Sequence, residues 1–186
     1  MKNNEHWLKK IKNKVVGITD GPEKSIEKNL QTPEEKIDKT EEIIEVIKTA
    51  EETLYKNNNP QYEETLAEPL ITSPDETIRV IKDRGWIKRG NAEEANCFLI
   101  RVLSRILNDG EGVIKEKALD VLIQIFATPD DNTTGWVCII EQSANAIAKA
   151  NMSDAKGKLE SLRSEVSGNN VKAVDYALNL LQDVRG

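Results

Sequence analysis

Hydrophobic residues recur at helical spacing along most of the chain, and the densest apolar stretch covers residues 91–127. Within it, residues 97–107 and 113–126 repeatedly place apolar side chains three and four positions apart, the spacing of one helix face. No segment alternates apolar and polar residues with the period of two that a half-buried strand requires. The pattern therefore predicts an all-α protein with its core centred on residues 91–127.

Glycines, prolines and N-cap residues divide the C-terminal part of the chain into helices of ordinary length. We expect one helical interaction domain over residues 73–186, built as a multi-helix bundle or a short α-solenoid-like stack. A partly disordered helical arm is expected to precede it. The five or six expected helices cover residues 73–83, 91–110, 111–127, 134–151, 153–168 and 170–184.

The arm contains an acidic helix over residues 32–56 and a linker over residues 57–72. In the helix, one apolar face follows the 4-3-4 spacing of a coiled-coil seam, which predicts self-association. Packing of the same face along the main domain is the alternative. In the linker, asparagines, prolines and paired glutamates interrupt every period, which predicts disorder. The four residues of the predicted seam are Ile43, Ile47, Ala50 and Leu54.

The first 31 residues read as a basic amphipathic helix followed by a linker. Five lysines against one glutamate give residues 1–14 a net charge of +4, although the whole chain carries −6. An amphipathic helix of this sign binds either an anionic membrane surface or a protein face, and both interpretations remain open. The residues predicted to make that contact are Trp7, Leu8, Lys9, Lys10 and Ile11.

Basic residues also gather around a tryptophan between two expected helices. Between residues 79 and 105, seven basic and three acidic residues give a local net charge of +4. This predicts a site for an acidic peptide, a phosphate or the chain's own acidic helix. The alternative is that the tryptophan seals an interhelix turn while the arginines are solvated. The predicted partner-binding residues are Arg84, Trp86, Lys88, Arg89, Arg101 and Arg105.

The residue types that carry common catalytic chemistry are sparse. His6 is the only histidine among the 186 residues, and it lies outside the expected domain. Cys97 and Cys138 fall in apolar segments, where a free thiol behaves as a small hydrophobic group. We therefore expect no enzymatic activity, no cofactor and no metal site.

Net charge and composition narrow the class of partner. A net charge of −6 and an aromatic content of 4% disfavour nucleic acid as the main ligand. No apolar run approaches the ~20 residues of a membrane-spanning helix, and nothing resembles a signal peptide. We expect a cytoplasmic protein, peripheral to a membrane if the first helix binds lipid. Its function is expected to be that of an adaptor that binds another protein and can form homo-oligomers.

Two near-identical pentapeptides suggest a family resemblance. Residues 118–122 (ALDVL) and 177–181 (ALNLL) lie 59 positions apart, each in an expected helix that follows a glycine-containing turn. This spacing of apolar and small residues resembles HEAT or armadillo units and helix pairs of the VHS domain, over less than half of the chain. The resemblance implies a stacked helical scaffold that binds proteins. The order of segments also resembles that of viral polymerase-cofactor phosphoproteins, which would imply an oligomer.

Overall fold

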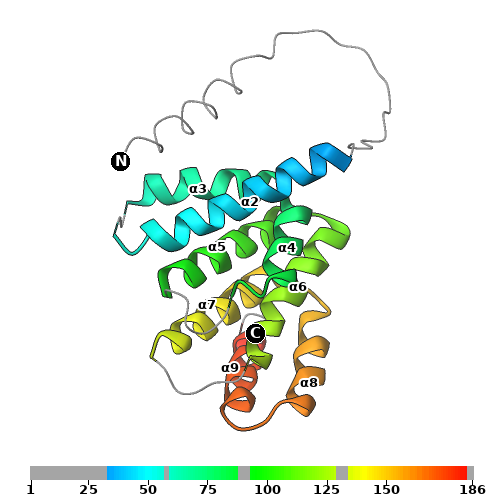
Figure 1. Cartoon of the computed structure of the whole chain (residues 1–186). Helices are drawn as coiled ribbons and strands as arrows, with labels where there is room; N and C mark the ends of the chain where they lie inside the picture. Colours follow the sequence, from blue (N-terminus) through cyan, green and yellow to red (C-terminus); the bar gives the residue numbers. More distant parts are fainter. Residues whose placement is uncertain (1–32, 57–58, 88–92, 129–133, 184–186) are drawn as a thin grey trace. The chain divides into compact units, whose positions relative to one another are not determined.

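The computed structural model describes residues 33–56, 59–87, 93–128 and 134–183 (Figure 1). All regular structure in these residues is helical, which confirms the predicted all-α class. The described helices are α2 (Pro33–Thr53), α3 (Pro60–Thr72), α4 (Pro74–Asp83), α5 (Glu93–Asp109), α6 (Gly112–Ala127), α7 (Thr134–Ala150), α8 (Ala155–Glu165) and α9 (Asn169–Asp183).

These helices stack in two layers, because each helix packs against the next but one along the chain. One layer runs α2, α4, α6, α8, and the other runs α3, α5, α7, α9 (Figure 1). Contacts between consecutive helices, such as α5 with α6 and α8 with α9, join the layers. This connectivity is that of stacked helical hairpins, so the chain from α2 to α9 has the α-solenoid-like form of the predicted fold.

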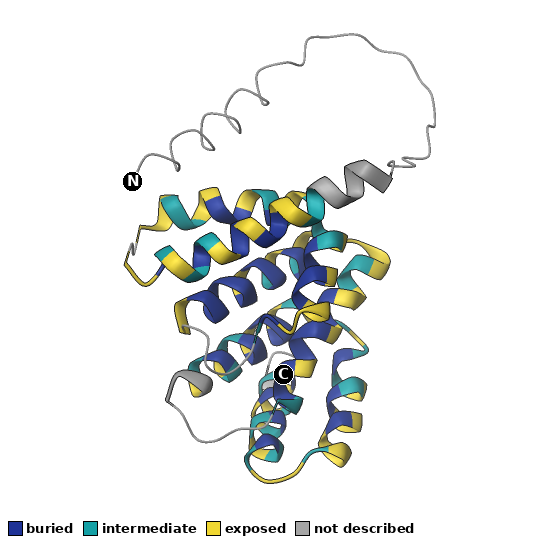
Figure 2. Ribbon diagram, viewed as in Figure 1, coloured by how far each residue is buried: buried dark blue, intermediate teal, exposed yellow. Residues whose placement is uncertain are grey.

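The core is centred on α5, which packs against α7, α6, α3 and α2. Phe98, Leu103 and Leu107 on α5 are fully buried, as are Leu119 and Phe126 on α6. Figure 2 shows more than half of α5 in the buried class. The prediction that residues 91–127 form the centre of the core is confirmed.

The predicted linker over residues 57–72 is wrong for residues 60–72, which form α3. Asn59 caps this helix by accepting a hydrogen bond from the Gln61 backbone N–H at 3.0 Å. Pro60 occupies the first turn, where a missing backbone donor costs nothing. Leu66 and Leu70 are buried on one face of α3, and this contact with the rest of the domain stabilises a helix that its own sequence favours only weakly.

The predicted self-association seam on α2 is covered by the chain itself. Ile43, Ile47, Ala50 and Leu54 have exposed fractions of 2, 0, 1 and 7%. The helix packs against α3, α4 and α5, as the alternative interpretation of an amphipathic helix along the main domain expects. The compact unit accordingly begins at Thr32, not at residue 73 as predicted, and α2 and α3 are part of it and not an arm.

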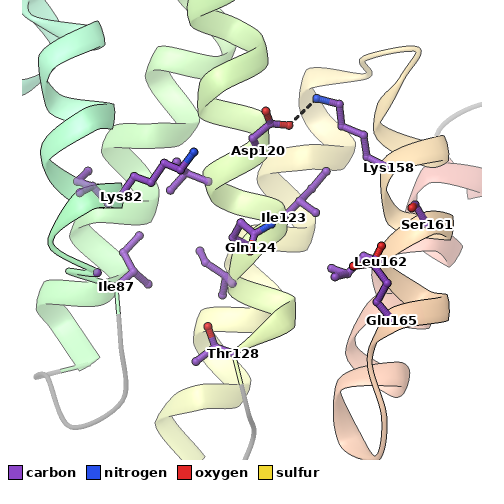
Figure 3. A pocket seen from close by; sticks show the side chains of 14 residues that line it. Lys82, Ile87, Asp120, Ile123, Gln124, Thr128, Lys158, Ser161, Leu162 and Glu165 are labelled. Atoms are coloured by element: carbon purple, nitrogen blue, oxygen red, sulfur yellow. Dashed lines mark hydrogen bonds and ion pairs between the residues drawn. The ribbon is translucent and has the colours of Figure 1, made fainter.

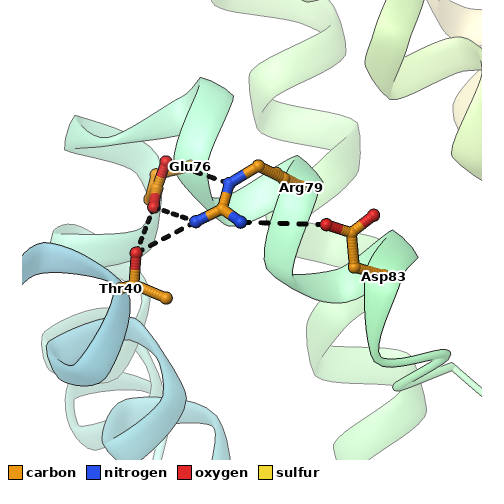
Figure 4. Close-up of polar contacts among 4 residues, drawn as sticks. All are labelled: Thr40, Glu76, Arg79 and Asp83. Carbon is orange, nitrogen blue, oxygen red and sulfur yellow. Dashed lines mark hydrogen bonds and ion pairs between the residues drawn. The ribbon is translucent and has the colours of Figure 1, made fainter. Parts of the chain in front are cut away.

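A polar cluster joins α2 to α4 at their exposed edge (Figure 4). The Thr40 hydroxyl donates a hydrogen bond to the Glu76 carboxylate and accepts one from Arg79 Nη2 at 3.0 Å. Arg79 also forms ion pairs with Glu76 and, at 3.8 Å, with Asp83. Glu76 thus faces α2, and the Ser73 side chain makes no capping hydrogen bond at the start of α4.

The short junction between α3 and α4 depends on one buried threonine. Pro74 has no backbone N–H, so it cannot donate to the Leu70 carbonyl four residues earlier as a continuing helix would. The Thr77 hydroxyl supplies this hydrogen bond at 2.9 Å, and the Thr77 residue is fully buried. The sequence thus replaces a missing backbone donor with a side-chain donor.

Replacing Thr77 with valine should lower the free energy of unfolding by about 1–3 kcal/mol, because the buried Leu70 carbonyl loses this donor. Equilibrium urea unfolding measures the change. The matched control is Thr65→Val, which removes a hydroxyl that bonds to Gln61 on the exposed side of α3 and should change stability by less than about 0.5 kcal/mol. Equal stabilities of the two variants would contradict this role of Thr77.

Candidate functional site

The structure describes four of the six predicted partner-binding residues, namely Arg84, Trp86, Arg101 and Arg105. Lys88 and Arg89 lie outside the described residues, as do residues 7–11 of the predicted membrane-binding or partner-binding helix. The other four fall into two groups, one at the C-terminal end of α4 and one on α5. The residues of each group contact other residues of the same chain.

Trp86 seals the turn after α4, as the alternative interpretation of this segment expects. Its backbone N–H bonds to the Ile81 carbonyl at 3.0 Å, and the Gly85 N–H bonds to the Lys82 carbonyl at 3.1 Å. With Gly85 at a φ of 55°, this pair of bonds is a Schellman motif. The indole is 9% exposed and donates through Nε1 to Glu51 of α2 at 2.8 Å, while Arg84 lies 5.8 Å from the ring centre.

Arg101 and Arg105 are paired with glutamates of α3. Arg101 Nε lies 2.6 Å from a Glu63 oxygen, and Arg105 makes two parallel hydrogen bonds to Glu64 at 2.7 and 2.6 Å. The bidentate contact lowers the pKa of the Glu64 carboxyl from its ordinary value. Within the described chain, the acidic helix that faces Arg101 and Arg105 is α3 and not the helix over residues 32–56.

The pairing of Arg105 with Glu64 predicts a charge-swap result. Either Arg105→Glu or Glu64→Arg should lower the melting temperature by placing like charges face to face, and the double variant should recover most of the loss. Because the pKa of Glu64 is lowered in the folded chain, the contribution of the pair is present at neutral pH and is lost as the pH falls through the folded-state pKa. Thermal melts of the four proteins at neutral and acidic pH measure both effects. Additive losses in the double variant would exclude the contact.

A cavity of about 320 Å³ lies beside these pairs, between α2, α3, α5 and α7. Cys97 lines it, is 6% exposed and accepts a hydrogen bond from Gln142 Nε2 at 3.2 Å. Burial raises the pKa of the Cys97 thiol, and contact with Glu93 raises that of Cys138. Both cysteines are free, and neither thiol is activated as a nucleophile.

A second cavity is a groove of about 650 Å³ between α4, α6 and α8, which we call the α4–α6–α8 groove. Figure 3 shows α4 and α8 as its walls, with side chains of α6 between them. No residue of this groove was among the predicted binding residues. Its apolar lining is Ile81, Ile87, Val121, Ile123, Ile125 and Leu162.

Polar side chains form the rim of the α4–α6–α8 groove. Asp120 and Gln124 are exposed on α6, and Lys158 of α8 forms an ion pair with Asp120 across the groove (Figure 3). This contact raises the pKa of Lys158, so the ammonium stays charged at neutral pH. Lys82 on α4 and Glu165 on α8 are exposed on opposite walls. Charged groups of both signs therefore surround a recessed apolar surface.

The sequence analysis expects no metal site and no membrane-spanning helix, and the described residues can be searched for both. Among them, no group of three or more histidine, cysteine, aspartate or glutamate side chains is arranged to hold a metal ion. None of the described helices combines the length and apolar character needed to cross a bilayer. In comparisons with known proteins, no family model, curated protein or solved structure matches this chain.

Proposed function

We propose that this chain is a non-enzymatic protein-interaction module whose helical domain binds a partner protein in the α4–α6–α8 groove. The observation that carries the proposal is the groove itself, about 650 Å³ in volume and open between three helices of one layer. Stacked helices commonly present such faces to other proteins. The groove combines recessed isoleucine and leucine side chains with exposed polar groups, the mixture found at protein interfaces.

The burial of the lining indicates how strongly a partner binds. Val121, Ile123 and Leu162 are already 93–95% buried in the free chain, with exposed fractions of 7, 5 and 7%. A partner therefore removes little additional apolar area from water, and apolar burial stabilises a complex by only about 25 cal/mol per Å². The polar rim must then supply most of the specificity, and the complex should be reversible rather than permanent.

Site-specific cross-linking in cells that naturally produce the chain tests this proposal. A photo-reactive amino acid replaces Gln124, which is exposed on α6 within the groove, or Lys149, which is exposed on α7 in the other layer and does not line the groove. We expect a covalent adduct with a defined protein from position 124, and no such adduct from position 149. Ser161 lies on α8 and lines the same groove. Replacing it with tryptophan fills the groove and should abolish the adduct. Absence of a specific adduct at position 124 would overturn the proposal.

A second role, contact with a membrane surface, is favoured by the sequence of residues 4–18 alone. Their lysines and the apolar residues Trp7, Leu8 and Ile11 match a peripheral amphipathic helix. Deleting residues 4–18 should abolish co-sedimentation of the full chain with vesicles that contain anionic lipid. Equal sedimentation of the deleted and intact chains would exclude this role and leave the groove proposal unchanged.

A further inference from the structure

A ridge of three polar side chains runs along the α4–α6–α8 groove. Asp120 and Gln124 on α6 and Thr128, directly after the helix, follow one another at a spacing of four, and the first two are exposed while the third is half-buried. All three line the groove, and Figure 3 shows α4 and α8 on either side of them. The groove therefore follows the axis of α6. A ridge with a spacing of four residues fits between the side-chain rows of a second helix, whose axis then lies about 8–10 Å away.

The charges on the two walls have opposite signs. Lys82 belongs to α4 and Glu165 to α8, and within the described part of the chain neither forms an ion pair. Lys158, by contrast, is engaged by Asp120 and, at 3.5 Å, by Asp154, so its charge is already balanced. An occupant of this groove therefore meets one uncompensated cation on the α4 wall and one uncompensated anion on the α8 wall.

We propose that the occupant is an amphipathic helix of a partner protein, with a carboxylate that faces Lys82, a cation that faces Glu165 and apolar side chains between them. This inference rests on the proposed function and adds the kind of partner. The ridge along α6 favours a helix over an extended segment, and the opposed wall charges fix its direction, because reversing the helix places like charges together. The apolar side chains contact Ile123 and Leu162 at the base of the groove.

A peptide library tests the inference on the full chain. Its members are displayed helices of about 18 residues, roughly 27 Å long, that share a leucine stripe and carry random charges on both flanks of that stripe. Selection on the full chain should enrich members with an acid on one flank and a base on the other. Selection on the single variant Lys82→Glu, in which both walls are acidic, should enrich members with a base on each flank. Removing one matched charge should weaken binding roughly twofold to fivefold, the effect of a rim ion pair.

Two exposed positions on different helices provide a matched comparison. Gln124→Trp on α6 fills the groove and should weaken binding of the selected helices about tenfold or more, whereas Lys149→Trp on α7, in the other layer, should leave binding unchanged. Thermal melts establish that both variants are folded. Enrichment of the same flank charges on the intact chain and on Lys82→Glu, or no enrichment at all, overturns the helical partner. In either case cross-linking at position 124 separately decides whether the groove binds protein.

Discussion

A fragment that begins at Ser73 should fail to fold cooperatively, whereas a fragment that begins at Thr32 should unfold cooperatively because it keeps every described contact. The first fragment lacks α2 and α3, which pack against α4 and α5. It thereby exposes the faces of α4 and α5 that these helices cover, and it removes the Glu51 carboxylate that pairs with the Trp86 indole. Exposing one large apolar side chain costs about 1.5–3 kcal/mol, so several together exceed the ~5–15 kcal/mol by which a domain is stable.

Thermal unfolding followed by circular dichroism distinguishes the two fragments. The Thr32 fragment should show one sharp transition, and the Ser73 fragment should show a shallow, non-cooperative loss of helix and should bind a dye that reports exposed apolar surface. A cooperative Ser73 fragment that melts within a few degrees of the Thr32 fragment would place the domain boundary at residue 73. That result would mean that α2 and α3 form an arm that the folded domain does not need.

The helices from α4 onward were predictable because local signals agree with tertiary burial there. For α6, the predicted range 111–127 differs by one residue from Gly112–Ala127, since a long apolar face and flanking breakers define both ends. The face of α2 was also read correctly as apolar at the 4-3-4 spacing. The sequence could not say whether a second copy or the chain's own helices cover it, because both give the same spacing.

The helix α3 was missed because its formation depends on contacts outside its own sequence. Proline at positions 60 and 69 and the run of asparagines before it are local signals for a loop. Three buried residues, Leu66, Ala67 and Leu70, are too few to give a periodic pattern, yet they suffice once α2 and α5 lie against them. Tertiary packing here outweighs weak local propensity.

The candidate site was less predictable than the fold, for two physical reasons. The local charge count around Arg101 and Arg105 omitted Glu63 and Glu64, which lie about forty positions earlier and neutralise these arginines. The groove arises from the way α4, α6 and α8 pack, which side-chain periodicity does not encode. The pentapeptide copies illustrate the same limit, since α6 and α9 lie in different layers and are not equivalent positions of a repeat.

Asn170 joins the last two helices to the rest of the stack, and its replacement by alanine should lower the free energy of unfolding by about 2–5 kcal/mol. Its Nδ2 donates to the Phe126 carbonyl at 2.8 Å and to the Thr128 carbonyl at 2.9 Å, at the C-terminal end of α6. The residue is 8% exposed, so water cannot readily replace the amide. Two carbonyls then lose a donor, at about 1–3 kcal/mol for each that remains buried.

Two comparison variants make this prediction specific to the hydrogen bonds of Asn170. Asn170→Asp keeps the size of the side chain but turns its donor into an acceptor that repels both carbonyls, so it should destabilise at least as much as alanine. Asn145→Ala removes an amide that bonds to the Glu141 carbonyl on the exposed side of α7, and should cost less than about 0.5 kcal/mol. Urea unfolding of the three variants measures these differences. A loss below about 1 kcal/mol for Asn170→Ala would contradict the stabilising role of these two hydrogen bonds between α9 and the end of α6.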